Sequence, residues 1–79
     1  MSTLNLLRWR ARRGMLELDI LLLDFLDTRY ASLPVGLQTA FAALLELDDS
    51  ALWDMIQARQ PAHTIEQAQI MEWLRKNEQ

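Results

Sequence analysis

The segment from Met15 to Arg29 constrains the fold of this chain more than any other stretch. Its strictest helical stripe consists of Met15, Leu18, Leu22, Phe25 and Leu26, and its flanks add Leu16, Ile20, Leu21 and Leu23. Apolar residues at this spacing predict an α-helix, and apolar residues on nearly all of its sides predict that other helices surround it. We therefore expect a buried central helix in an all-α bundle, with Asp19, Asp24 and Asp27 reaching toward solvent.

Residues that stop helices divide the rest of the chain into four further predicted helices. They cover about residues 4–12, 34–47, 50–59 and 65–77. Pro34 is tolerated only in a first helical turn, so a new helix has to begin near it, and Pro61 ends the helix before the last one. No segment shows the sustained alternation of a strand, so the predicted fold is a small five-helix bundle with short connections.

Two capping patterns support these boundaries. Asp48-Asp49-Ser50 places acidic and hydroxyl side chains where the first N–H groups of a helix are free. Thr64 and Gln67 have the spacing of a capping box before the last helix. The residues expected to face inward on these four helices are Leu4, Leu7, Ala11, Leu37, Ala40, Phe41, Leu44, Leu45, Leu52, Trp53, Ile56, Ile70, Met71 and Leu74, with Trp73 at the border.

The length of 79 residues predicts one domain over residues 1–79, with a core from about residue 4 to 75. The chain has no cysteine, which excludes disulfides and thiolate metal sites and fits a reducing compartment. The longest uncharged run, residues 30–45, has 16 residues, whereas a membrane-spanning helix needs roughly 20 mainly apolar ones. The N-terminus lacks a long apolar core, so we expect neither a signal peptide nor membrane insertion.

No residues of this sequence form a recognisable catalytic motif. His63 is the only histidine, and no motif supplies the nucleophile and orienting partner that a catalytic base needs. Gly14 and Gly36 are the only glycines, so there is no glycine-rich phosphate loop. One histidine, no cysteine and scattered carboxylates predict no dedicated metal site. The residues therefore favour a protein that binds another molecule over an enzyme.

Arginines are concentrated at one end of the chain. Residues 8–13 hold four arginines and no acid, while the rest holds four basic and eleven acidic residues, a formal charge of −7. On one helix, Arg8 and Arg12 would share one side and Arg10 and Arg13 another. Because the positive charge is split between two sides, neither side is positive enough to favour binding of nucleic acid. We expect a solvated basic face. The tryptophans are expected at the core or its edge, with Trp9 alternatively beside the arginine stems at an interface.

The stretch "RRGMLELD" places a glycine before the strongest helical run. In a continuous helix, Arg10, Arg13 and Glu17 would share a face, and Arg13 would be able to pair with Glu17. Gly14 inside a helix costs about 1 kcal/mol relative to alanine, so its presence needs a reason. Two reasons stay open: a turn between two helices, or a docking spot where another backbone comes close because no Cβ intervenes.

This stretch resembles the Arg-Gly-x-x-Glu signature of the succinate dehydrogenase flavinylation factors, the SdhE-type FAD assembly factors. The signature corresponds to Arg13, Gly14 and Glu17, followed by Leu18-Asp19 as in the family. A second stretch, "LLELDDSALWDMI" from Leu44 to Ile56, resembles the family's Leu-Glu-x-Asp-Asp segment and the apolar helix after it. The resemblance covers about residues 5–75, and the C-terminal third diverges most.

The resemblance implies a protein that is not an enzyme. It would bind the flavoprotein subunit of succinate dehydrogenase or fumarate reductase in the bacterial cytoplasm and promote covalent attachment of FAD to a histidine of that partner. FAD would belong to the partner, with no cofactor held tightly by this chain. The expected partner-binding residues are Arg13, Gly14 and Glu17, joined by Asp19, Arg10 and Arg12.

Two alternatives to this function stay open. The first is an antitoxin role, since bacterial relatives have also been described as countering a membrane-associated toxin. The second is a helical module whose basic N-terminal patch binds acidic partners with strong salt sensitivity and no need for the glycine. We expect a monomer, although apolar residues off the main helical stripes leave a dimer interface open.

Overall fold

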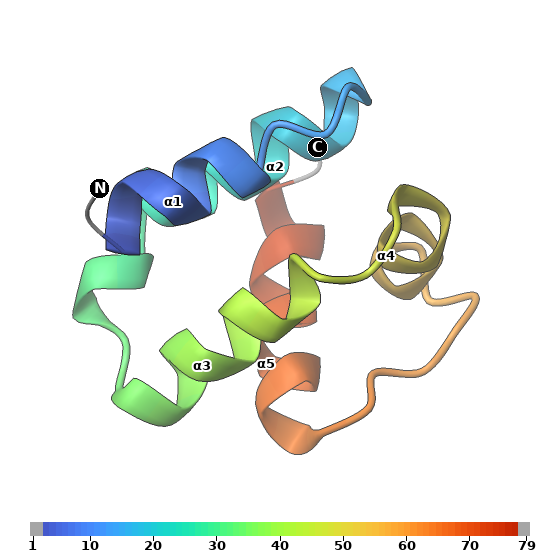
Figure 1. Cartoon of the computed structure of the whole chain (residues 1–79). Coiled ribbons are helices and arrows are strands. Elements are labelled where there is room, and N and C mark those ends of the chain that lie inside the picture. Colours follow the sequence, from blue (N-terminus) through green and yellow to red (C-terminus); the bar gives the residue numbers. More distant parts are fainter. Residues whose placement is uncertain (1–2, 78–79) are drawn as a thin grey trace.

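The computed structural model describes residues 3–77, which form five α-helices and one short 3-10 turn without a strand (Figure 1). The elements are α1 (Thr3–Arg10), α2 (Leu16–Thr28), the 3-10 turn η1 (Tyr30–Ser32), α3 (Val35–Leu44), α4 (Asp49–Ile56) and α5 (Ile65–Asn77). The all-α, five-helix prediction is confirmed. No helix in this range is long and apolar enough to cross a membrane.

Most predicted helix ends lie beyond the observed ones. The predicted helix over 4–12 stops at Arg10, and the one over 34–47 stops at Leu44. Pro34 precedes α3 with an extended backbone, and its carbonyl accepts hydrogen bonds from the N–H groups of Leu37 and Gln38. The missing N–H of proline costs nothing there, because a helix start leaves N–H groups unpaired anyway.

Both predicted caps are confirmed. The Asp48 carboxylate accepts a hydrogen bond of 2.8 Å from the Ala51 N–H at the start of α4. Thr64 Oγ1 accepts one of 3.0 Å from the Gln67 N–H, and the Gln67 side chain accepts one of 3.0 Å from the His63 N–H. These local bonds explain why α4 and α5 begin where the sequence predicts.

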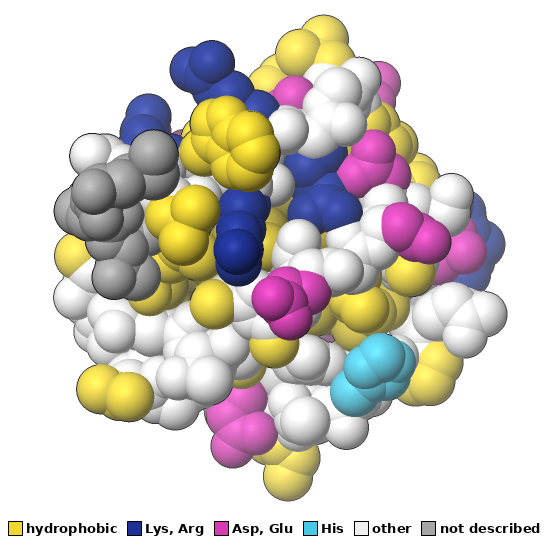
Figure 2. Space-filling view, in the orientation of Figure 1, with side chains coloured by type: hydrophobic (Ala, Val, Ile, Leu, Met, Phe, Trp, Pro, Cys, Tyr) yellow, Lys and Arg dark blue, Asp and Glu magenta, His cyan; other side chains and the backbone are white. Residues whose placement is uncertain are grey.

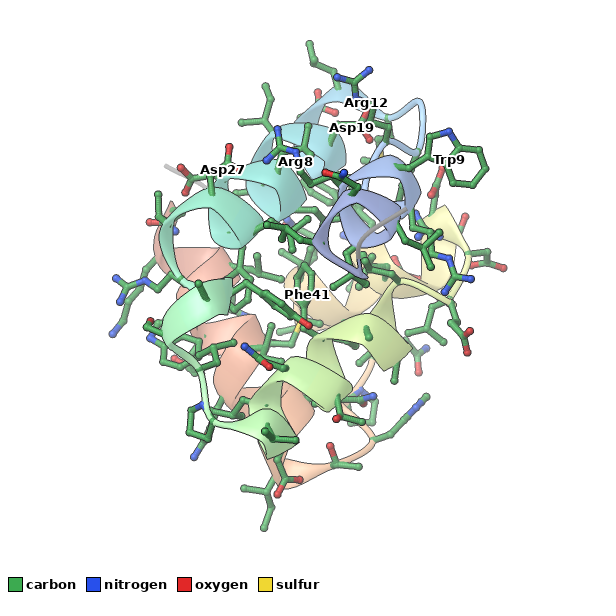
Figure 3. All side chains as sticks on the ribbon, turned by 60° about the vertical axis from the view of Figure 1, so that its left-hand side comes forward. Arg8, Trp9, Arg12, Asp19, Asp27 and Phe41 are labelled. Atoms are coloured by element: carbon green, nitrogen blue, oxygen red, sulfur yellow. The ribbon has the colours of Figure 1, made fainter. Side chains whose placement is uncertain are left out.

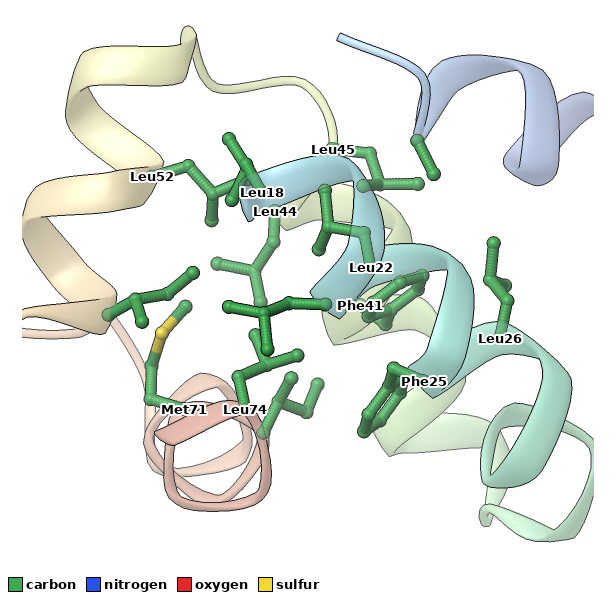
Figure 4. Packing of buried hydrophobic residues seen from close by; sticks show 14 of the residues in the cluster. Leu18, Leu22, Phe25, Leu26, Phe41, Leu44, Leu45, Leu52, Met71 and Leu74 are labelled. Carbon is green, nitrogen blue, oxygen red and sulfur yellow. The ribbon is translucent and has the colours of Figure 1, made fainter. Parts of the chain in front are cut away.

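The core is one cluster to which all five helices contribute. Figure 4 shows side chains of α2, α3, α4 and α5 meeting in the middle of the bundle. Phe25 of α2 stacks on Phe41 of α3 with ring centroids 4.7 Å apart, and Trp73 of α5 lies 5.9 Å from Phe25. The buried apolar residues are Leu7, Ala11, Leu18, Leu21, Leu22, Phe25, Leu26, Ala40, Phe41, Leu44, Leu45, Leu52, Met55, Ile56, Ile70, Met71 and Leu74.

The prediction that helices surround α2 on all sides is wrong. Leu16 and Ile20 are 69% and 58% exposed, although Leu18 and Leu22 are fully buried. Leu16 and Ile20 are four residues apart and share a side of α2 that no other described element covers. Periodicity identified the buried stripe of α2, but it overstated the width of that stripe.

The other inward stripes hold with a few exceptions. Leu4 is 43% exposed, Leu37 is only half-buried, and Met55 belongs to the core although the sequence did not indicate it. Trp53 and Trp73 pack at the core edge, as predicted. Trp9 does not, because it is 70% exposed.

A left-handed residue ends α4. Ala58 has φ +62°, and its neighbour Arg59 donates its N–H to the Asp54 carbonyl over 2.8 Å. The guanidinium of Arg75 in α5 closes the same helix end, since it donates to the carbonyls of Met55 and Ile56 at 2.8 Å each. These bonds satisfy carbonyls that the end of a helix leaves without partners.

We expect Ala58→Gly to stabilise the protein by about 0.5–1 kcal/mol, because glycine adopts this conformation without steric cost. The melting temperature should rise by a few degrees in a thermal scan. Ala68→Gly is the matched control, since Ala68 is an exposed residue inside α5 and the same substitution there should cost about 1 kcal/mol. Equal destabilisation by both variants would contradict the assigned role of Ala58.

Candidate functional site

The stretch between α1 and α2, residues 11–15, is a turn and is called the joint below. Gly14 in the joint has φ +90°, a conformation that side chains of L residues rarely adopt. The continuous helix considered for this stretch is therefore wrong, and the turn alone accounts for a glycine. A Cβ built on Gly14 meets no atom within 4 Å, so the backbone here faces open space. That openness is also what close approach by another protein requires.

Arg13 points into the protein, and its side chain is only 11% exposed. Its Nε donates to Asp49 Oδ1 at 2.5 Å and its Nη1 to the Leu45 carbonyl at 2.7 Å, while Nη2 donates to the Leu47 carbonyl. These acceptors lie between the end of α3 and the first residue of α4. A guanidinium suits this place because it offers several donors in one plane and a positive charge beside helix-end carbonyls.

Asp19 holds the joint from the other side. Its carboxylate accepts hydrogen bonds from the backbone N–H groups of Arg13 at 2.7 Å and Gly14 at 3.3 Å. In the structure its half-buried carboxylate binds the backbone of the joint from α2, and the predicted contact of Asp19 with a partner stays a prediction. Arg13 and Asp19 together fix the conformation in which Gly14 is exposed.

Glu17 lies exposed on the first turn of α2, and its carboxylate has no hydrogen bond or ion pair within residues 3–77. The ion pair between Arg13 and Glu17 that a continuous helix would have allowed does not form, because Arg13 turns to Asp49. The Glu17 carboxylate therefore stays available to another molecule. Of the three signature residues, Gly14 and Glu17 face outward and Arg13 faces inward.

The two remaining predicted residues line a hollow of about 830 Å³ next to the joint. Arg10 lies 3.8 Å from Glu46, and Arg12 is exposed without an ion pair in the part of the chain that is described. Trp9 forms part of the same hollow. Figure 2 shows basic side chains gathered around this part of the surface, close to acidic ones.

Sequence reasoning missed the role of Asp49, which it treated only as a cap. Asp49 accepts a hydrogen bond from Arg13, which no local pattern indicates. The available signal was that the chain contains both family-like stretches, since Arg13 belongs to the first and its acceptors Leu45, Leu47 and Asp49 belong to the second. Neither stretch alone indicates that they meet. No group of three or more His, Asp or Glu residues within residues 3–77 is arranged to hold a metal ion.

Comparison with known proteins gives a consistent result. A family described as flavinators of succinate dehydrogenase matches residues 5–78. A protein of Idiomarina loihiensis named FAD assembly factor SdhE is 35% identical over 68 residues, 86% of this chain and 76% of its own length. The protein of that name in Pseudomonas aeruginosa is 41% identical over 58 residues, 73% of this chain and 69% of its own length.

Other relatives match over a smaller share of their length. The FAD assembly factor SdhE of Aliivibrio fischeri is 43% identical over 49 residues, which are 62% of this chain but 57% of that protein. Thus the chain spans less than two thirds of the length of several relatives that it matches. No solved structure gives a significant match.

Proposed function

Because the chain belongs to the family described as flavinators of succinate dehydrogenase, we propose that it is an assembly factor for a flavoprotein. It binds the flavoprotein subunit of succinate dehydrogenase or fumarate reductase and promotes covalent attachment of FAD to a histidine of that subunit. The observation that carries this proposal is the family match over residues 5–78 together with an exposed, braced signature at Gly14 and Glu17.

The joint is the docking surface in this proposal. Gly14 lets the partner's backbone come close, and the free Glu17 carboxylate accepts hydrogen bonds from it. Arg13 and Asp19 contribute indirectly, because their hydrogen bonds within the protein hold the turn in its conformation. This differs from the direct contacts that the sequence suggested for these two residues. Docking stabilises the partner's domains around FAD in the geometry that favours bond formation, a positioning effect.

The reacting groups belong to the partner in this proposal. The chain then needs no catalytic residue and no cofactor of its own, and FAD stays in the flavoprotein. The name FAD assembly factor, which the relatives carry, supports a role in assembly and gives no support to the antitoxin alternative. The site of action is the bacterial cytoplasm, where the flavoprotein subunit is assembled.

A host that lacks this protein tests the proposal. Covalent flavin on the flavoprotein subunit, read as fluorescence in a denaturing gel, is expected to fall on deletion and to return when the wild-type gene is supplied. The tagged protein is expected to co-purify with that subunit. Unchanged covalent flavin in the deletion strain, without co-purification, would rule the proposed function out.

Glu17 provides a matched pair of variants for the same assay. Glu17→Gln removes a charge that has no partner within residues 3–77, so the melting temperature should not change while affinity for the flavoprotein falls about threefold to tenfold. Glu66→Gln, an exposed carboxylate in the first turn of α5, is the control and should leave affinity within twofold.

A further inference from the structure

The hollow beside α1 has features that the joint does not explain. Trp9 is 70% exposed at its wall, and Figure 3 shows its indole projecting from α1 on the side away from Arg8 and Asp27. A tryptophan carries a large apolar surface whose burial dominates many protein interfaces. Its exposure beside a hollow is therefore unusual for a residue that only maintains the fold.

The arginines around Trp9 differ in whether their guanidinium groups already have partners within the protein. Arg8 pairs with Asp27, outside the hollow, and all three nitrogens of the Arg13 guanidinium already donate to acceptors. Arg12 has no ion pair within residues 3–77. Among the described residues, Arg10 has an ion pair only with the exposed Glu46 at 3.8 Å, a pair worth roughly 0–1 kcal/mol. Arg10 and Arg12, which line the hollow together with Trp9, thus have guanidinium donors that another molecule can bind.

We propose that this hollow binds an acidic segment of the flavoprotein subunit. A carboxylate of that segment would bind Arg12 and displace Glu46 from Arg10, and a neighbouring apolar side chain would cover Trp9. The inference rests on the proposed function and adds the chemistry of the partner's contact.

Two further observations favour this occupant. The lining of the hollow carries three arginines, Arg10, Arg12 and Arg13, against the carboxylates of Glu46 and Asp49. Its net charge of +1 suits one or two carboxylates better than a chain of phosphates. The hollow is continuous with the joint, because Arg13 lines it and Gly14 follows directly in the chain. A stable interface covers about 800 Å² on each partner. A partner docked on the joint over such an area would also cover the neighbouring hollow.

Affinity for the purified flavoprotein subunit, measured by titration calorimetry, tests the inference. Trp9→Ala is expected to weaken binding about tenfold or more, and Arg12→Glu about fivefold to tenfold. Glu46→Gln should act in the opposite direction and tighten binding about twofold, because it removes the carboxylate that competes for Arg10. All three side chains are exposed, so the melting temperatures should stay close to that of the wild type.

Val35→Ala and Arg59→Glu are the matched controls, an equally exposed apolar residue and an exposed arginine outside the hollow. Both should bind within twofold of the wild type. Wild-type affinity in Trp9→Ala and Arg12→Glu would overturn the inference and leave the proposed function standing. A wild-type chain that does not bind the flavoprotein at all would instead defeat the proposed function, and this inference with it.

Hydrogen exchange on the flavoprotein identifies the chemistry of the occupant. The segment that the wild-type protein protects and Trp9→Ala does not is expected to be rich in Asp and Glu. A basic or uncharged segment would overturn the inference. So would self-association of this chain that Trp9→Ala abolishes without any change in flavoprotein affinity, because the occupant would then be a second copy.

Discussion

Gly14→Arg is expected to leave a folded chain that no longer supports covalent attachment of FAD. The φ of +90° makes any L side chain there costly, by about 1–2 kcal/mol. A domain of this length has a free energy of unfolding of about 4–12 kcal/mol, so it should stay folded. The new side chain would project into open space at the joint and obstruct the partner's approach. Covalent flavin in a host carrying only this variant measures the effect.

Two further substitutions at Gly14 distinguish obstruction of the partner's approach from strain in the backbone. Asparagine tolerates positive φ better than other residues with a side chain, so Gly14→Asn should melt at a higher temperature than Gly14→Ala. If Gly14 serves docking, Gly14→Asn should nevertheless support less flavinylation than Gly14→Ala, because its side chain is larger. Flavinylation that simply follows melting temperature across the three variants would mean that the glycine serves the turn alone.

Arg13→Ala is expected to lower the free energy of unfolding by about 2–3 kcal/mol, the cost of leaving several partly buried acceptors without a donor. The carbonyls of Leu45 and Leu47 and the carboxylate of Asp49 all lose their common donor. In a domain of this size the melting temperature should fall by roughly 10–20 °C. Arg13→Lys should recover only part of the loss, because an ammonium group lacks the planar fork.

Arg12→Ala is the matched control for this experiment. The two arginines are neighbours in the sequence, but Arg12 is exposed and Arg13 is nearly buried. Arg12→Ala should therefore change the free energy of unfolding by less than about 0.5 kcal/mol. Equal melting temperatures for the two alanine variants would show that Arg13 does not hold the loop between α3 and α4.

Local patterns predicted the parts of the fold that depend on local interactions. The caps at Asp48 and Thr64 were predictable because donor and acceptor are three residues apart. The C-terminal ends of helices were less predictable, because their last carbonyls are bonded within 3-10 turns or by side chains from other helices. The exposed face at Leu16 and Ile20 was missed, since an apolar position does not reveal whether another element covers it.

The candidate site was predictable in part for the same reason. The sequence singled out Gly14, but only φ showed that the chain turns there, and docking at the same glycine stays a prediction. The acceptors of Arg13 lie 32 to 36 positions further along the chain, beyond the reach of any helical spacing. The side chain of Trp9 combines a large apolar ring with a polar N–H, so this residue type fits the core edge and an exposed binding surface equally well. Only the arrangement in space decided between them.

The hydrogen bonds of Arg13 make the conformation of the joint depend on residues that lie 32 to 36 positions further along the chain. All three acceptors of the Arg13 guanidinium follow the end of α3, so a chain cut at that point contains the whole signature and Asp19 but none of these acceptors. A nascent or truncated product would carry the signature without its brace. The proposed docking surface would then form only in chains that extend past Asp49, and fragments that end before this residue should bind the flavoprotein less well.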